Sequence, residues 1–220
     1  CPVRICDTRH FLEKNRFDAI LHIGALRGGR KYSRSEYFQV NVNATEQLMI
    51  NAWNNDSKFI FCSSVGVFGA IPDQLPADNE TTKNPDNYYH FTKIRAERLL
   101  QSYVLKGLNG IVIRPSIAYG PYDHGFPYTL AKLVDKKLLY LPDSLVKIHL
   151  TNIDLLTQAF EKALETDQPS GSEFIVADSK PVEIHELADY ISTQIHGEPY
   201  PRKKKLPLSW FRNGEKIATL

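Results

Sequence analysis

The sequence predicts an α/β protein with a doubly wound parallel sheet, followed by a smaller C-terminal lobe. Short, continuously apolar runs alternate with segments of helical periodicity, which is the rhythm of β-α-β units. The run over residues 58–63 is apolar almost to its end, as expected of a strand buried on both faces. Because such strands end in Gly-rich or polar turns, we expect the functional site at their carboxyl ends.

In the first half, apolar runs predict four strands, over residues 3–6, 19–23, 58–63 and 110–113. Apolar residues at helical spacing predict helices over 35–53 and 88–105. Residues 69–87 are rich in Pro, Asp and Asn, so they predict a long ordered loop before the second helix.

After Pro121 the sequence becomes more polar and is punctuated by prolines. It predicts one short strand over residues 174–176 and three helices, over 126–136, 153–164 and 182–195. We therefore expect a main domain over residues 1–121. Residues 122–220 are expected to form mainly a smaller lobe that supplies substrate contacts, with some segments returning to the main sheet.

Composition limits the classes of function. The 220 residues suffice for one sizeable core and a smaller lobe, and 42% hydrophobic with 24% charged residues is typical of a globular protein in water. A net charge of +2 favours neither nucleic-acid nor membrane binding, and no apolar run approaches the roughly 18 residues that span a bilayer. The three cysteines show no metal or redox spacing, so we expect no metal site and a reducing, cytoplasmic location.

The strongest chemical signal is Tyr89 followed four residues later by Lys93, on one face of a predicted helix. A nearby ammonium stabilises the phenolate, so we expect the Tyr89 pKa to fall toward neutrality. Such a phenol can move a proton to or from an alcohol or carbonyl oxygen, which the Ser64 hydroxyl would hold in place. Taken alone, the pair fits an ordinary amphipathic helix, and Ser63 with Ser64 fits ordinary turn hydrogen bonds.

The surrounding pattern is more specific. Ser64 lies 25 positions before Tyr89, and five blocks occur in a characteristic order, at residues 17–25, 41–45, 61–69, 89–93 and 113–121. They contain a strand ending in His-x-Gly-Ala, an Asn-Val-x-Ala-Thr helix, the Ser strand, the Tyr-x-x-x-Lys helix, and an Arg-Pro turn followed by Tyr-Gly-Pro. This order resembles the extended short-chain dehydrogenase/reductases of the NAD-dependent epimerase/dehydratase family.

The resemblance implies a Rossmann-type domain that binds NAD or NADP, here over residues 1–121. It implies Tyr89 as the acid/base, Lys93 as the residue that holds the nicotinamide ribose, and Ser64 as the hydrogen-bond partner of the reacting oxygen. His22 is interpreted as a structural histidine. The implied cofactor-binding positions are Asp7, Thr8, Ile23, Gly24, Ala25, Leu26, Asn41, Cys62, Ser63, Tyr89, Lys93, Pro115 and Ser116.

One expected motif is missing, because no Gly-x-x-Gly-x-x-Gly turn occurs in the sequence. Such a turn follows the first strand of dinucleotide-binding domains, where it holds the pyrophosphate. The matching blocks begin at the family's third strand, so two βα units are unrepresented. We expect these units upstream of Cys1 rather than a degenerate protein, because a sheet without them would expose apolar faces and an open edge.

The resemblance implies a small-molecule substrate, and we expect hydride transfer on a sugar or sugar nucleotide. Ile148 and His149 stand where sugar-nucleotide epimerases usually carry an Arg, and Ile117 where UDP-sugar 4-epimerases carry Asn. Those differences leave open a carbonyl reductase or hydroxysteroid-dehydrogenase-like enzyme with a small apolar substrate. A non-catalytic, dinucleotide-sensing or interaction protein is the third alternative. The family also implies a homodimer formed through the two long helices.

Overall fold

The computed structural model describes residues 15–27, 32–202 and 205–207, and it divides into two units. The first unit contains a four-stranded, fully parallel sheet in the order β1-β2-β3-β8. Its strands are β1 (Ala19–His22), β2 (Lys58–Cys62), β3 (Gly110–Pro115) and β8 (Glu173–Val176). This arrangement confirms the predicted α/β fold with a parallel sheet. The strand predicted over residues 3–6 lies outside the described residues.

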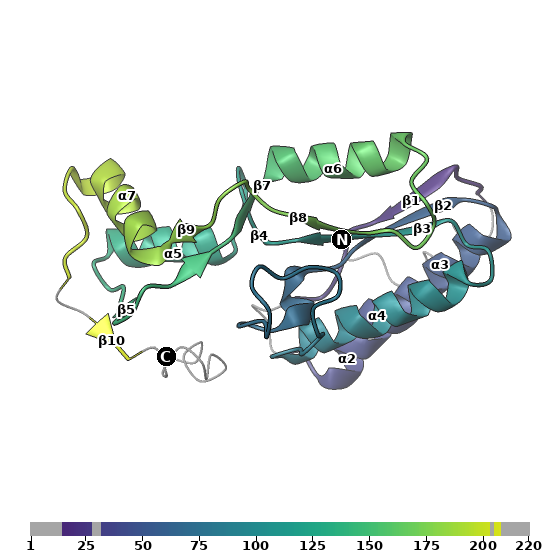
Figure 1. Ribbon diagram of the computed structural model, residues 1–220, viewed down its shortest axis with the longest axis horizontal. Helices are drawn as coiled ribbons and strands as arrows, with labels where there is room; N and C mark the ends of the chain where they lie inside the picture. The colour runs from purple at the N-terminus through teal and green to yellow at the C-terminus, as the bar shows by residue number, and fades with distance from the viewer. Residues whose placement is uncertain (1–14, 28–31, 203–204, 208–220) are drawn as a thin grey trace. The chain divides into compact units, whose positions relative to one another are not determined.

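Helices cover both faces of this sheet (Figure 1). On one face lie α2 (Arg34–Phe38), the π-helix η1 (Gln39–Asn43), α3 (Ala44–Asn54) and α4 (Tyr88–Val104). On the other face lies α6 (Ile153–Glu165), which belongs to this unit from Thr157 onward. The first three helices run without a break, so the single helix predicted over residues 35–53 contains a π-helical segment instead of regular α-helix throughout.

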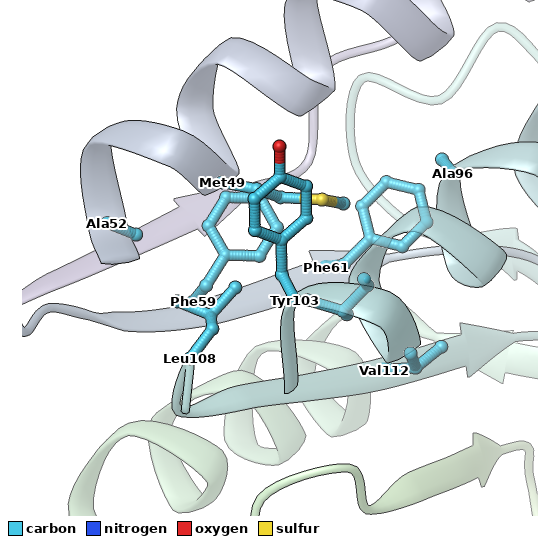
Figure 2. Close-up of a cluster of buried hydrophobic side chains, with 9 residues drawn as sticks. Met49, Ala52, Phe59, Phe61, Ala96, Tyr103, Leu108 and Val112 are labelled. Carbon is cyan, nitrogen blue, oxygen red and sulfur yellow. The ribbon is translucent and has the colours of Figure 1, made fainter. Parts of the chain in front are cut away.

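The main core lies between the sheet and helices α3 and α4 (Figure 2). Phe59 and Phe61 project from β2 and are fully buried, and each such side chain stabilises the fold by roughly 1.5–3 kcal/mol. The other buried members of this cluster are Met49, Ala52, Ala96, Leu100, Tyr103, Leu108 and Val112. The core therefore fixes β2 and α4, the two elements that carry the predicted catalytic residues.

Capping determines where the helices begin. Ser33 and Glu36 form a reciprocal capping box at the start of α2. The Asn87 side chain accepts a hydrogen bond from the His90 backbone N–H at 2.9 Å, which starts α4 one residue before Tyr89. After β2, the short 3-10 helix η2 (Val65–Phe68) begins with Ser64 as its cap.

The second unit has its own core around α5 (Phe126–Asp135) and α7 (Ile184–His196). Its strands form three two-stranded pairs: β4 (Ile117–Tyr119) with β7 (Leu150–Asn152), β5 (Leu141–Pro142) with β10 (Lys205–Leu206), and β6 (Lys147–Ile148) with β9 (Val182–Glu183). The buried side chains of this core are Leu130, Val134, Leu139, Leu141, Ile184, Ala188 and Tyr200.

Candidate active site

Helix α4 presents three chemically important side chains on successive turns: Tyr89, Lys93 and Glu97. Lys93 and Glu97 are 2% and 1% exposed. Residues four apart on a helix share one face, so the pair predicted from the sequence extends by one further turn. Glu97 was not predicted as a site residue. Its position four residues after Lys93, on the same face of the predicted helix, was the available signal.

Lys93 reaches the carboxyl end of β2. Its Nζ atom donates a hydrogen bond to the Cys62 carbonyl oxygen at 2.6 Å. The same atom lies 4.7 Å from the centroid of the Phe61 ring and 5.7 Å from that of the Tyr89 ring. Burial lowers the pKa of Lys93 to about 8, because water no longer solvates the ammonium.

The pKa of Tyr89 differs from the value expected from the sequence. Burial raises the pKa of its phenol to about 12, and only the Arg27 charge acts in the lowering direction. The expected fall toward neutrality was therefore wrong for this arrangement. The ammonium of Lys93 lies over the phenol ring and is hydrogen-bonded to Cys62, while desolvation disfavours the phenolate.

The two serines after β2 have different partners. Ser63 is 2% exposed, and its hydroxyl donates to Glu97 Oε1 at 2.5 Å. Ser64 Oγ accepts a hydrogen bond from the Gly66 backbone N–H at 3.1 Å, which leaves the Ser64 hydroxyl proton able to donate. Of the two, Ser64 therefore has the chemistry expected of a group that holds a substrate oxygen.

The turn carrying Ser64 packs directly on the first turn of α4. A Cβ atom on Gly66 would lie 2.0 Å from Nε2 of His90, so the imidazole fills the place of a side chain at residue 66. His90 Nδ1 is 2.6 Å from Asp86 Oδ1, and its ring centroid is 5.2 Å from that of Tyr89. The contact brings the Ser64 turn to the end of α4 that carries Tyr89.

A buried network of charges surrounds Glu97. The Arg114 guanidinium, on β3, donates to both Glu97 oxygens at 2.9 Å, and Lys83 Nζ lies 2.8 Å from Glu97 Oε2. Arg114 also contacts Glu173 Oε2 at 2.5 Å and Asn79 Oδ1 at 2.9 Å. These partners hold the pKa of Glu97 below its usual value, although burial alone would raise it.

Asn41 joins the turn after β1 to α4. Its side chain accepts from the Leu26 N–H at 2.8 Å and donates to the Leu26 carbonyl at 2.9 Å. It also donates to Thr92 Oγ1 at 3.1 Å, and Thr92 in turn donates to the Tyr89 carbonyl at 2.7 Å. Asn41 thus holds the backbone of the turn after β1 next to α4. Its predicted contact with a cofactor stays a prediction.

The remaining predicted cofactor positions are distributed as follows. Ile23 and Gly24 are exposed at the end of β1, and a Cβ on Gly24 would meet nothing within 4 Å, so a ligand can approach the backbone there. Pro115 is buried at the end of β3, and Ser116 begins the second unit, where its hydroxyl lies 2.6 Å from Thr151 Oγ1. Asp7 and Thr8 lie outside the described residues.

His22 takes part in the packing under the site. Its Nε2 is 2.8 Å from Thr45 Oγ1, which itself donates to the Asn41 carbonyl at 2.9 Å. Because the Thr45 hydrogen is committed to that carbonyl, Nε2 must be the donor, which defines the neutral tautomer of His22. Burial lowers the His22 pKa to about 4, in keeping with a structural histidine.

Residues 4–177 match the family model described as the NAD dependent epimerase/dehydratase family, which is most of the chain. The chain belongs to the NAD-dependent epimerase/dehydratase family. Membership agrees with the order of sequence blocks and with the parallel sheet. The match ends one residue after β8, so it includes every strand of the described sheet and the complete Tyr89–Lys93 helix.

Individual relatives of this family member include enzymes and a binding protein. It is 30% identical over 122 residues to an N-acetyl-alpha-D-glucosaminyl-diphospho-ditrans,octacis-undecaprenol 4-epimerase of Escherichia coli O157:H7, covering 54% of this chain and 36% of the relative. It is 30% identical over 156 residues to the Arabidopsis thaliana chloroplast stem-loop binding protein of 41 kDa b, covering 69% of this chain and 40% of the relative. The chain thus spans well under half the length of these curated relatives.

Among solved structures, the UDP-glucuronic acid 4-epimerase of Bacillus cereus in complex with NAD superimposes with a TM-score of 0.77. The similarity covers 93% of this chain and 67% of that one at 22% sequence identity. At this identity the likeness establishes the fold, a Rossmann-like sheet of the epimerase type. In the described part of the chain, no helix combines the length and apolarity needed to cross a bilayer.

Proposed function

We propose that this family member is part of an NAD- or NADP-dependent enzyme that transfers hydride at a hydroxyl or carbonyl carbon of a sugar or sugar nucleotide. Tyr89 is the proposed acid/base, Ser64 the group that holds the reacting oxygen, and Lys93 the neighbouring cation. The relatives named as 4-epimerases support the substrate class.

The observation that carries this proposal is the convergence of α4 and β2. Tyr89 and Lys93 lie one turn apart on α4, and Lys93 is anchored to the last carbonyl of β2, two residues before Ser64. The end of a parallel strand is where α/β proteins bind ligands. Burial of the Lys93 ammonium costs free energy of folding, so stability alone does not account for a lysine at this position.

The protonation state of Tyr89 suits this side chain to donate a proton. A phenol with a pKa of about 12 carries its proton at neutral pH, so Tyr89 is ready to donate to a carbonyl oxygen. Ser64 can donate a second hydrogen bond to the same oxygen, stabilising the negative charge that develops on it. In the reverse direction Tyr89 takes the proton from an alcohol as the phenolate, a form that a pKa of about 12 makes scarce at neutral pH.

The residues present fit the nicotinamide end of a dinucleotide. The backbone at Gly24 is open to a ligand, and Lys93 can interact with ribose hydroxyls. When bound, the dinucleotide supplies the hydride donor or acceptor. The proposed cofactor is NAD or NADP, and contacts from Asp7, Thr8 and the other predicted cofactor positions remain predictions.

Replacing Tyr89 by Phe tests the proposal. In the intact protein, Tyr89→Phe should lower hydride transfer by about 10²–10⁴-fold and leave dinucleotide affinity close to that of wild type. Tyr88→Phe removes the same atom from the neighbouring residue and serves as the control. The substrate panel pairs nucleotide sugars with simple ketones and sterols. An active Tyr89→Phe protein would refute the mechanism.

The same panel separates the alternatives. Turnover of small apolar ketones alone would indicate a carbonyl reductase or hydroxysteroid-dehydrogenase-like enzyme. A protein that binds dinucleotide yet turns over nothing would be a sensing or interaction protein, an alternative favoured by the relative named as a stem-loop binding protein.

A homodimer remains part of the proposal, formed through the long helices α3 and α4 of two copies. Light scattering of the intact protein checks this arrangement. A monomeric mass at micromolar concentration would exclude it.

A further inference from the structure

The hydrogen bond between Ser63 and Glu97 joins the two elements of the proposed active site. Ser63 immediately precedes Ser64 at the end of β2, and Glu97 lies one turn beyond Lys93 on α4. The hydroxyl and the carboxylate are both buried, and their oxygens are 2.5 Å apart. A hydrogen bond to an ionised acceptor in a buried setting is short and strong, so it restricts the Ser63 side chain to one rotamer.

The position of Glu97 is itself fixed by its neighbours. Arg114 grips both carboxylate oxygens in a two-pronged contact, and Lys83 adds a second cation at 2.8 Å. Arg114 is in turn held by Glu173 and Asn79. Arg114 and Lys83 thus hold the carboxylate directly, and Glu173 and Asn79 hold it through Arg114, so groups from three other segments fix its position.

Each of the three consecutive residues at the end of β2 and just after it is consequently held by a hydrogen bond. The Cys62 carbonyl accepts from Lys93, the Ser63 hydroxyl donates to Glu97, and Ser64 Oγ accepts from Gly66. Ser63 also donates its backbone N–H to the Ile113 carbonyl at 2.7 Å. Two of these contacts come from the same face of α4, so the helix that carries Tyr89 determines where the chain leaves the sheet.

We propose that Glu97 is a positioning residue that, through Ser63, sets the location of the Ser64 hydroxyl relative to the Tyr89 phenol. The inference rests on the proposed function, because it concerns the geometry of the same reaction. Glu97 touches no reacting atom. Its effect arises because a displacement of about 1 Å in a reacting group can cost about 10²-fold in rate.

Ser63→Ala in the intact protein is the direct test. It removes the hydrogen bond and leaves the Glu97–Arg114 pair in place, so no buried charge loses its partner. We expect kcat to fall by about 10–100-fold with KM close to that of wild type. Ser63→Thr, which keeps the hydroxyl, should restore most of kcat. Ser102→Ala, which removes a hydroxyl that donates to the Leu99 carbonyl at the far end of α4, is the matched control and should leave kcat nearly unchanged.

Crystal structures of wild type and Ser63→Ala supply a readout that does not depend on turnover. The inference requires Ser64 Oγ to shift relative to the Tyr89 hydroxyl in the variant. An unmoved Ser64 would overturn it, as would an unchanged kcat, or a loss that Ser63→Thr fails to restore or that Ser102→Ala reproduces. If wild type turns over no substrate, the proposed function fails separately, and the Ser64 displacement alone decides whether Glu97 positions this turn.

Discussion

Lys93 Nζ lies 2.6 Å from the carbonyl oxygen of Cys62, so the buried ammonium of α4 is fastened to the end of the neighbouring strand. This contact places a cation beside Tyr89 without directing it at the phenol oxygen. It also gives the ammonium a hydrogen-bond partner inside the protein, where Lys93 is only 2% exposed to water.

Lys93→Met should lower turnover by about 10²-fold, since it removes the ammonium that joins α4 to the end of β2 and that is proposed to hold the cofactor ribose. Activity with the best substrate of the panel measures this loss. Lys132→Met, which removes a cation lying over the Tyr128 ring in the second unit, is the control and should remain active.

Lys93 should also leave a signature in the pH dependence of stability. Its pKa is about 8 in the fold against 10.5 for a free lysine, so between these values the unfolded chain binds more protons than the folded one. The free energy of unfolding of wild type should therefore rise, relative to Lys93→Met, as pH increases from about 8 to 10.5. Urea titrations across this range measure the difference, and parallel curves for the two proteins would contradict the assignment.

His22 should affect stability in the acidic range. Its folded pKa of about 4 lies below the ordinary 6.5, so the unfolded chain takes up a proton first as pH falls. Wild type should lose stability between pH 6.5 and about 4, and His22→Gln should lose less over this interval. Unfolding midpoints of the two proteins, followed by circular dichroism, provide the measurement.

Arg114→Met should destabilise the protein strongly. The guanidinium is fully buried, and its removal leaves the Glu97 carboxylate with Lys83 as its remaining charged partner among the described contacts. Breaking a buried ion pair in this way costs about 3–5 kcal/mol. Lys137→Met, which removes an exposed contact to Glu198, is the comparison and should cost less than about 1 kcal/mol. Equal effects in urea unfolding would show that the buried network contributes little.

Gly66→Ala should disturb the Ser64 turn, because the new methyl group would overlap the His90 ring. Overpacking of this kind costs about 1–3 kcal/mol, and we expect kcat to fall with it. His90→Ala in the same protein removes the obstruction, so the double variant should be more stable than Gly66→Ala alone. Additive losses in stability would show that the two residues do not compete for one space.

The sequence predicted the strands of the four-stranded sheet, because its central strands β2 and β3 are short apolar runs buried along almost their whole length. The strand predicted over residues 58–63 and the helix predicted over 88–105 were both identifiable from apolar spacing, and in the structure Asn87 caps that helix. The strand predicted over residues 174–176 had no predicted partner, since so short a run gives no clue to which strand it pairs with. In the structure it pairs with β3 and completes the sheet.

The residue types of the candidate site could be predicted from the sequence, whereas the pKa values and charge partners of its side chains could not. Tyr89, Lys93 and Ser64 could be named from their spacing, whereas the raised Tyr89 pKa depends on burial by residues distant in sequence. The partners of Glu97 were equally hidden, because Lys83, Arg114 and Glu173 come from separate segments. Long-range pairing of charges leaves no periodic pattern in a single sequence.

The π-helical segment Gln39–Asn43 carries Asn41, whose side chain reaches both Leu26 and Thr92. A π-helical turn holds about one residue more than an α-helical turn, so deleting one residue there would rewind the segment into α form while the helices on either side keep their faces. The number of residues between Ser33 and Thr45 therefore decides whether one side chain can join the turn after β1 to helix α4.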